Sequence, residues 1–452
     1  MKRVSPQKVL NTSLIVVFIL LVLPLYVDKG LHASFDHANG SGTVGGIDFK
    51  AYYIAADMLR TRRDFYDVEL QTDEVLARGL PLNESFYIYP PLLAMVFLPL
   101  TAVSIQTAAQ LWFFFNLVLY GVALVLICRS LELSRFTRML PLLWILAFLF
   151  PPVLFNLHKG QVNIVVLLLL ALTYCLYRRG LDAAAGVALG SAVMIKVIPV
   201  FLLLYFVWKR RVVLSLAALA TIVVIGVLGL LIVGVGPHAT YLTEVMPSLA
   251  EPRPNPSNQS LGGFFSLLLI RNSYADNIIH NPGLWKGLTW TLSLALVASV
   301  VAVSSRHEGA VHSLELEIGL VIATMPLISN IAWVDMLVLL LFPYAVILKY
   351  SLTARTGALR VSPESRLFSD PLLGTALLGS LFASALLVSS PRFVDLLFNV
   401  VRWHPGLVRS PLLLSLPFYG SAILWLTLAF MLVYSRKLVR SHDDSLHARP
   451  CS

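Results

Sequence analysis

Residues 212–235 of this chain read VVLSLAALATIVVIGVLGLLIVGV, a run of apolar and small residues without a charge. A helix needs about 20 apolar residues to cross the hydrocarbon core of a bilayer. Shorter runs of the same character recur, among them 14–25 and 164–172. Of the 452 residues, 58% are hydrophobic and only 13% are charged, against roughly 25% charged in a soluble domain. These features exclude a soluble globular protein and predict an all-α polytopic membrane protein.

Twelve segments are long or apolar enough to be transmembrane helices, or short helices packed within a bundle. They are 10–27, 108–128, 139–157, 161–177, 183–196, 198–208, 212–235, 285–304, 314–330, 333–349, 371–390 and 412–434. The 34 Lys and Arg residues outnumber the 24 Asp and Glu residues. These basic residues gather in short connections on alternate sides of the segments, as the positive-inside rule requires. The pattern predicts cytoplasmic termini and argues against nucleic-acid binding as the reason for the positive charge.

Two long loops face outward in this topology, residues 28–88 and residues 236–284. The apolar segment 90–99 is bracketed by prolines, and counting it as a span would invert the basic cluster that follows. We therefore expect a juxtamembrane helix there. No small-residue cleavage site follows the first apolar segment, so we expect an uncleaved helix rather than a signal peptide.

The sequence holds no pattern that predicts a metal or cofactor. Cys128, Cys175 and Cys451 form no CxxC pair and indicate neither a disulfide framework nor a metal site. HExxH, GxxxxGK[ST], GxSxG and GxGxxG are all absent. The zinc protease, ATPase, hydrolase and dinucleotide-binding classes therefore lack support.

The first outer loop carries a candidate general base. Asp48 lies where the chain returns to the membrane in an amphipathic stretch, residues 49–59. A partly desolvated carboxylate can take a proton from a hydroxyl, although Asp is also a favoured N-cap, and both roles are compatible. Tyr52, Tyr87 and Tyr89 in the same loop fit either an interfacial aromatic belt or the binding of a sugar or lipid head group.

Residues 156–163 form a polar stretch between two strongly apolar segments. Unpaired polar groups are costly in a membrane, so such a stretch lines a cavity, lies at the interface or makes a hairpin turn. His158 and Lys159 would suit a phosphate, whereas Gln161 and Asn163 would suit hydroxyl or amide partners.

Lys196 is a second candidate for binding an anion. It follows an apolar run and precedes Val197, Ile198 and Pro199. An ammonium at that place needs an anionic partner, such as a lipid head-group phosphate, or must extend to the interface.

Two polar stretches later in the chain are candidates for donor or acceptor binding. Asn258 and Gln259 lie in a proline-rich part of the second outer loop. Trp333 and Asp335 lie at the outer end of two predicted spans. Asp335 could be a second functional acid or the capped start of a helix.

The order of these motifs resembles one known family. Asp48 is followed by Tyr87-Ile-Tyr-Pro-Pro91, Gly160-Gln-Val-Asn163, Ile195-Lys-Val-Ile-Pro199 and Asn258-Gln-Ser-Leu261. Over about residues 45–350 this order is similar to glycosyltransferase family 87 of the GT-C superfamily, whose studied members are polyprenyl-phosphate-mannose-dependent mannosyltransferases. Asn330 and Asp335-Met336 stand where family members often have a proline and two histidines.

The resemblance implies a GT-C fold, with a catalytic module over 1–350, C-terminal helices over 351–452 and juxtamembrane helices in the first outer loop. It implies an inverting transfer of a sugar, with mannose expected, from a polyprenyl-phosphate donor to a lipid or glycan acceptor on the non-cytoplasmic face of the cell membrane. Asp48 would be the general base, and Lys196 with His158 or Lys159 would hold the donor phosphate. The expected partners are these substrates and membrane lipids, without a cofactor.

Two other functions remain open at this point. A twelve-span transporter would be expected to show internal pseudo-symmetry, and the sequence shows no convincing repeat. An envelope polysaccharide polymerase or ligase would use a lipid-diphosphate donor and would concentrate arginines in its outer loops. The first loop instead mixes Lys and Arg with acidic residues.

Overall fold

A computed structural model describes residues 12–16, 18–24, 26–27, 46–80, 85–136, 139–304, 314–355, 363–390 and 409–447. Within them the secondary structure is helical, and the sole extended pairing is an isolated antiparallel bridge between Asn258 and Trp333. The all-α prediction is confirmed. Residues 28–45 of the predicted first outer loop lie outside the described residues.

The chain divides into two compact units. Unit 1 comprises Met1–Val207 and Arg211–Glu251, and unit 2 comprises Trp208–Arg210 and Pro252–Ser452. The division at residue 350 that the resemblance implies stays a prediction.

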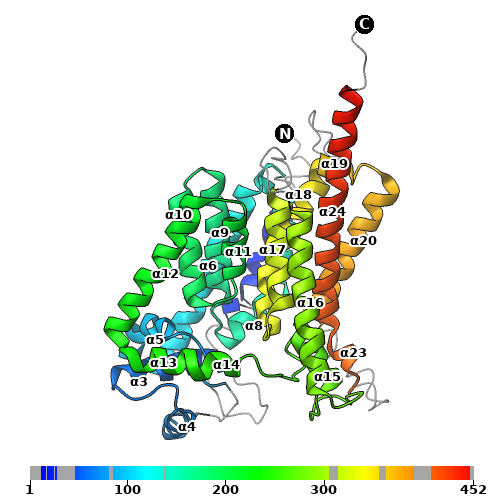
Figure 1. Ribbon diagram of the computed structural model, residues 1–452. Helices are drawn as coiled ribbons and strands as arrows, with labels where there is room; N and C mark the ends of the chain where they lie inside the picture. Colours follow the sequence, from blue (N-terminus) through cyan, green and yellow to red (C-terminus); the bar gives the residue numbers. More distant parts are fainter. Residues whose placement is uncertain are drawn as a thin grey trace, which may run out of the picture. The chain divides into compact units, whose positions relative to one another are not determined.

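Unit 1 contains a group of long helices and, at one end, a set of short ones (Figure 1). Its elements are η1 (Phe18–Val22), α3 (Ile47–Arg60), α4 (Val68–Ala77), α5 (Pro91–Phe97), η2 (Leu98–Ala102), α6 (Ile105–Ser130), η3 (Leu133–Arg135), α7 (Leu140–Phe148), α8 (Pro151–Lys159), α9 (Asn163–Arg178), α10 (Asp182–Ile195), α11 (Val200–Trp208), α12 (Val212–Val233), α13 (Val235–Thr240), η4 (Tyr241–Val245) and α14 (Met246–Ser248).

Unit 2 is a second group of helices, in which α17 packs against α16, α18 and α24, and α20 packs against α24. Its elements are α15 (Leu261–Leu269), α16 (Pro282–Val303), α17 (Leu314–Ile328), η5 (Val334–Leu340), α18 (Leu341–Arg355), α19 (Pro363–Arg366), α20 (Pro371–Val388), α23 (Pro411–Leu414) and α24 (Leu416–His447).

Six described helices are long and apolar enough to cross a membrane, or seven if the bent pair α7 and α8 counts as one span. The other predicted segments coincide with helices that are shorter, such as α9 and α10, or incompletely described. The membrane prediction is confirmed, whereas the count of twelve spans stays a prediction. The predicted span 139–157 is two helices bent by 48° at the break before Pro151.

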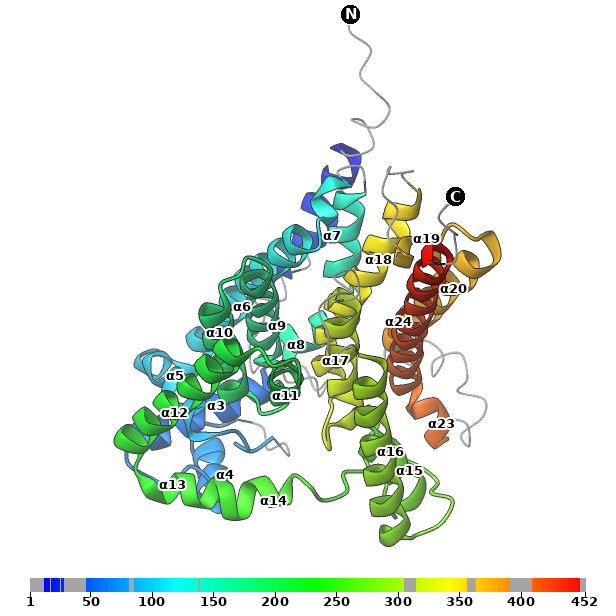
Figure 2. The same cartoon turned by 45° about the horizontal axis from the view of Figure 1, so that its top comes forward.

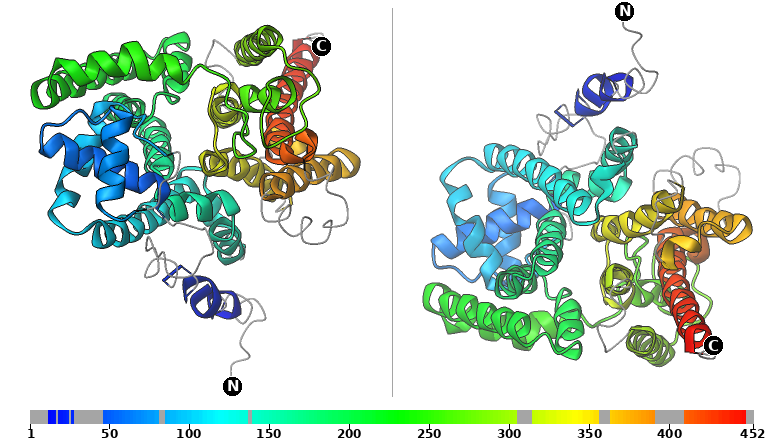
Figure 3. Two further views of the ribbon diagram at one scale, coloured as in Figure 1. Left: turned by 90° about the horizontal axis from the view of Figure 1, so that it is seen from below. Right: turned by 90° about the horizontal axis from the view of Figure 1, so that it is seen from above.

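The short helices of the first loop form the core that positions the candidate site. Figure 3 shows α3, α4 and α5, in blue shades, grouped together within unit 1. Phe49, Tyr52 and Ile54 of α3 pack with Phe97 and Trp112 in one buried cluster. The predicted amphipathic stretch 49–59 is therefore a helix buried on nearly all sides, and the predicted juxtamembrane segment 90–99 supplies α5 and η2 beside it.

A glycine breaks the last long helix of unit 1. Gly234 has a φ of 91°, a value that L side chains rarely adopt, and α12 ends there. The chain then continues through α13, η4 and α14 at an angle to α12 (Figure 2). Tyr241 on η4 packs into the cluster around α3, so this segment closes the same core.

Small residues allow α10 and α12 to pack with their backbones close together. Gly186 and Gly190 lie four residues apart on one face of α10, against the carbonyl groups of Leu214 and Ala218. A Cβ at Gly190 would lie 2.5 Å from the Ala218 carbonyl oxygen. Such small-residue pairs are the usual means of helix association in membranes, where close van der Waals packing replaces the hydrophobic effect.

Buried ion pairs connect several segments of unit 2. Glu317 is 1% exposed and accepts from both Lys209 Nζ at 2.8 Å and Arg436 Nη2 at 2.9 Å. Glu315 is paired with Lys349 in the same way. Because a buried carboxylate is costly without a cation beside it, these pairs fix the start of α17 against α18 and α24.

We predict that Gly190→Leu lowers the melting temperature of the purified protein, because the new side chain has to displace the α12 backbone. Overpacking of this kind costs about 1–3 kcal/mol. The control is Gly226→Leu on α12, where an added Cβ meets nothing within 4 Å. Equal melting temperatures for the two variants would show that the α10–α12 contact is not as close as described.

Candidate functional site

The turn after α8 is the centre of the candidate site in unit 1. Gly160 ends α8 in the left-handed region, with a φ of 70°. Its carbonyl oxygen accepts from Trp112 Nε1 at 2.7 Å, and a Cβ added to it would lie 2.6 Å from the Cβ of Phe49. Only glycine fits this conformation and this close approach, so a turn at Gly160, one of the three alternatives for residues 156–163, is present.

Asp48 lies in the first turn of α3, beside the end of α8. Gly46 occupies the N-cap position, and its N–H donates to the His158 carbonyl oxygen at 2.6 Å. Ser85 Oγ donates to Asp48 Oδ1 at 2.7 Å. The cap position therefore belongs to Gly46, and the partly exposed Asp48 carboxylate is oriented by Ser85.

The Gln161 carboxamide joins two of the predicted tyrosines. Tyr52 donates to Gln161 Oε1 at 2.9 Å, and Gln161 Nε2 lies 2.9 Å from the Tyr89 hydroxyl. Tyr52 and Gln161 are fully buried, whereas Tyr89 is partly exposed. Of these three, Tyr89 is therefore the side chain with surface to offer a ligand.

Tyr87 is also buried, at 2% exposure. Its hydroxyl donates to the Pro90 carbonyl oxygen at 2.6 Å and accepts from the Ala94 N–H at 2.9 Å. Burial raises the pKa of this hydroxyl well above its ordinary value, so it stays protonated. These contacts fix the start of α5, while the predicted ligand-binding role of Tyr87 stays a prediction.

Lys196 is hydrogen-bonded to Asn163, three residues after Gly160. Lys196 caps the end of α10, and its Nζ donates to Asn163 Oδ1 at 2.6 Å. Asn163 is the first residue of α9 and is fully buried. Because a helix N-terminus also favours negative charge, the half-buried ammonium and the start of α9 together suit an anion.

The structure brings most of the predicted residues of unit 1 together on one core. Val162 belongs to the buried cluster of Phe49 and Tyr52, and Ile195 packs against that cluster. His158, which is exposed, and Lys159, which is partly buried, form the last turn of α8. The helix start that carries Asp48 and the side chain of Lys196 are thus both bonded to residues 158–163, and such an arrangement suits proton removal beside a bound anion.

Sequence reasoning missed Lys50, two residues after Asp48. It is only 1% exposed. Burial lowers its pKa from 10.5 to about 8, against the opposing effect of the nearby Asp48. A lysine between Phe49 and Ala51 in a largely apolar stretch was the available signal, but an amphipathic interpretation of α3 assigns it to the polar face.

The later predicted residues lie in unit 2, where a hydrogen-bonded cluster joins the loop before α15 to the loop before η5. Asn258 Oδ1 accepts from the Ala332 N–H at 2.9 Å, and Asn258 Nδ2 donates to the Asn330 carbonyl oxygen at 3.1 Å. Gln259 donates to the Leu414 carbonyl oxygen at 3.0 Å and accepts from the Phe418 N–H at 2.8 Å. Both side-chain amides are therefore occupied by hydrogen bonds to backbone groups.

Trp333 and Asp335 lie next to this cluster in the chain. Trp333 is the partly exposed residue paired with Asn258, and it precedes η5. Asp335 is fully buried in the first turn of η5. Trp333 therefore has surface for a ligand, and Asp335 does not in this conformation.

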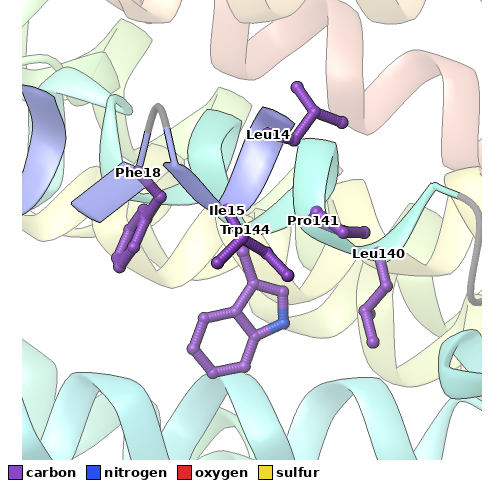
Figure 4. Close-up of a pocket in the computed structure, with 6 residues that line it drawn as sticks. All are labelled: Leu14, Ile15, Phe18, Leu140, Pro141 and Trp144. Carbon is purple, nitrogen blue, oxygen red and sulfur yellow. The ribbon is translucent and has the colours of Figure 1, made fainter. Parts of the chain in front are cut away.

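An apolar pocket of about 240 Å³ is lined by none of these polar groups (Figure 4). It is lined by Leu14, Ile15, Phe18, Leu140, Pro141 and Trp144. This lining is apolar, so the cavity brings no acid, base or cation to the site. Among the described residues, no group of three or more His, Cys, Asp or Glu side chains could hold a metal ion.

Comparison with known proteins gives a family for most of this region. The sequence profile of glycosyltransferase family 87 matches residues 87–330, more than half of the chain. The match includes Gln161, Asn163 and Lys196. Asp48 lies before the matched range, so its role depends on geometry.

Three curated relatives are polyprenol-phosphate-mannose-dependent mannosyltransferases. The phosphatidylinositol pentamannoside mannosyltransferase of Mycobacterium tuberculosis is 29% identical over 258 residues, 55% of this chain and 56% of the relative. A phosphatidylinositol mannoside mannosyltransferase of Mycobacterium tuberculosis is 27% identical, over 40% of this chain and 44% of the relative. One of Mycolicibacterium smegmatis is 30% identical, over 32% and 35%. The chain spans about half or less of the length of these relatives.

One solved structure is also similar. The crystal structure of ArnT from Cupriavidus metallidurans bound to undecaprenyl phosphate matches with a TM-score of 0.41 and 16% identity. The match covers 92% of this chain and 77% of that chain.

The Gly160 turn gives a prediction with a matched control. Gly160→Ala adds a Cβ both at a positive φ and against Phe49, whereas Gly180→Ala adds one at a φ of 73° with nothing within 4 Å. Backbone strain alone costs about 1–2 kcal/mol. We expect Gly160→Ala to lower the melting temperature clearly more than Gly180→Ala does. Equal losses would mean that the contact with α3 does not constrain the turn.

Lys50 predicts a pH dependence of stability. Its pKa is about 8 in the folded protein against 10.5 ordinarily, so the unfolded chain binds more protons between those two values. Stability conferred by this position therefore rises with pH from about 8 to 10.5. Thermal melts across that range should show the rise in wild type and a flatter profile in Lys50→Met. Identical profiles would contradict the buried, destabilised ammonium.

Proposed function

Because this chain belongs to glycosyltransferase family 87, we propose that it is a membrane glycosyltransferase that moves a sugar from a polyprenyl-phosphate carrier to a lipid or glycan acceptor. Family membership confirms the resemblance found in the motifs. Mannose is the proposed sugar, since all three relatives are named for a polyprenol-phosphate-mannose donor. The apolar helices provide surfaces against which the polyprenyl tail of the donor can pack within the membrane.

The observation that carries the proposal is that the helix start bearing Asp48 and the Lys196 side chain are both hydrogen-bonded to the segment around Gly160. Gly46 binds the end of α8, and Asn163 binds Lys196 three residues beyond the turn. One short segment thereby positions both a carboxylate and an ammonium. An inverting transfer needs these two groups, one for the incoming hydroxyl and one for the leaving phosphate.

In the proposed reaction the acceptor oxygen attacks the anomeric carbon of the donor sugar. The bond from that carbon to the phosphate oxygen breaks, and the polyprenyl phosphate leaves with the electron pair. Asp48 receives the proton of the acceptor hydroxyl, and Ser85 keeps the carboxylate oriented by donating to Oδ1. Lys196 stabilises the charge that develops on the phosphate, with His158 or Lys159 as a further cation.

The remaining predicted residues are proposed to bind donor or acceptor in different ways. Tyr89 in unit 1 and Trp333 in unit 2 are partly exposed aromatic side chains, and each taken by itself suits contact with a sugar. Tyr52, Gln161, Asn258 and Gln259 are buried and hydrogen-bonded, so their proposed contribution is support: Tyr52 and Gln161 for Tyr89, Asn258 for Trp333, and Gln259 for the start of α24.

The proposed site faces the non-cytoplasmic side. The positive-inside pattern assigns the loop that carries α3 and the end of α8 to the outside, and the basic connections to the cytoplasm. The protein would thus act in the cell membrane with both termini in the cytoplasm.

The proposal is tested with purified protein, radiolabelled polyprenyl-phosphate-mannose and a lipid extract from the native host. We predict a labelled lipid product with wild type and a loss of at least about a hundredfold with Asp48→Asn, since general-base catalysis contributes about 10²–10⁴. Asp57→Asn is the matched control, because Asp57 is also on α3 but pairs with Arg60 and Arg78. It should keep most of the activity.

Each other outcome has a definite meaning. Near-wild-type transfer by Asp48→Asn would remove Asp48 from the base role. Absence of product with wild type, also when glucose or arabinose replaces mannose in the donor, would contradict the transferase and favour the transporter.

A further inference from the structure

Two buried asparagines of unit 1, one on α6 and one on α8, have side-chain atoms without a hydrogen-bond partner among the described residues. Asn156 is fully buried, and neither its Oδ1 nor its Nδ2 has a hydrogen-bond partner among the described residues. Asn116 is 1% exposed, and its Oδ1 is likewise unsatisfied. Its Nδ2 donates within α6, to the Trp112 carbonyl oxygen at 3.0 Å.

Two hydrogen bonds fix how α7 and α8 run along α6. Trp112 on α6 binds Gly160 at the end of α8, and Tyr120 on α6 binds the Ala147 carbonyl oxygen on α7 at 2.6 Å. The bent pair α7–α8 therefore runs antiparallel to α6. Asn116 is one turn after Trp112, and Asn156 is one turn before Gly160, so both lie between the two bonds.

The surroundings of the pair are apolar. Phe113 on α6, and Val153 and Leu154 on α8, are all buried. An amide left without a hydrogen bond in such surroundings destabilises the folded protein, because it has lost its bonds to water without replacement. The three unsatisfied atoms comprise one donor nitrogen and two acceptor oxygens, which a single small molecule with both functions can satisfy.

We propose that Asn116 and Asn156 form a binding site for an ordered water molecule that joins α6 to α8. The water accepts from Asn156 Nδ2 and donates one hydrogen to Asn116 Oδ1 and the other to Asn156 Oδ1, as internal waters do for otherwise unpaired groups. It holds α8 in the position from which Gly160 meets Trp112 and Phe49. The proposal is independent of the sugar-transfer reaction, so either can fail alone.

A double-mutant cycle on thermal stability tests this bridge. Asn116→Leu, Asn156→Leu and the double variant are compared with wild type in the same detergent. Each single change breaks the bridge and leaves the other amide unpaired, so each should lower the melting temperature by several degrees. The double change should cost no more than the larger single loss, because the two losses share one interaction.

A buried polar residue outside the site serves as the control. Thr173 on α9 is fully buried, and its hydroxyl donates to the Leu169 carbonyl oxygen at 2.8 Å. Thr173→Val should combine additively with Asn156→Leu. Additive losses within the asparagine pair, or a melting temperature raised by Asn156→Leu, would overturn the bridge.

An experimental structure of the wild type gives a readout that does not depend on folded variants. Density for a water within hydrogen-bonding distance of both Asn156 Nδ2 and Asn116 Oδ1 would support the proposal, whereas a water that contacts only one of the two asparagines would contradict it. Direct contact between the two amides, with no density between them, would refute it.

Discussion

The contact of Gly160 with Phe49 is the constraint on which the candidate site depends. A side chain at residue 160 would collide with α3, so this glycine sets how close the end of α8 comes to the helix that carries Asp48. Trp112 holds the carbonyl oxygen of the same glycine, and Gln161 next to it binds Tyr52. Three residues beyond the glycine, Asn163 holds Lys196. Groups far apart in sequence thus meet because one tight turn passes between them.

Much of this arrangement could be predicted from the sequence because membrane solvation leaves strong signals. The long run 212–235 cannot be a soluble core, and polar residues such as Gln161 and Asn163 between apolar helices have to be paired or functional. The same argument singled out Lys196. That Gln161 binds Tyr52 and Asn163 binds Lys196 depends on how helices pack, which periodicity does not encode.

Other features could not be predicted, for identifiable physical reasons. Lys50 is buried because α3 is enclosed on nearly all sides, whereas a pattern of one apolar face predicts a solvated lysine. The side chains of Asn258 and Gln259 donate hydrogen bonds to the backbone carbonyl groups of Asn330 and Leu414. Those residues are distant in sequence, and no local motif predicts that they lie nearby. The unpaired amides of Asn116 and Asn156 become visible only when the register of α6 against α8 is known.

The central claim is that the Gly160 turn assembles one site in which Asp48 faces a sugar whose phosphate is held by Lys196. The most direct measurement is an experimental structure of the wild-type protein with polyprenyl-phosphate-mannose bound. The account predicts the phosphate within hydrogen-bonding distance of Lys196 Nζ and the anomeric carbon on the side of the Asp48 carboxylate. A donor bound with its phosphate away from Lys196, or with its sugar out of reach of Asp48, would contradict it.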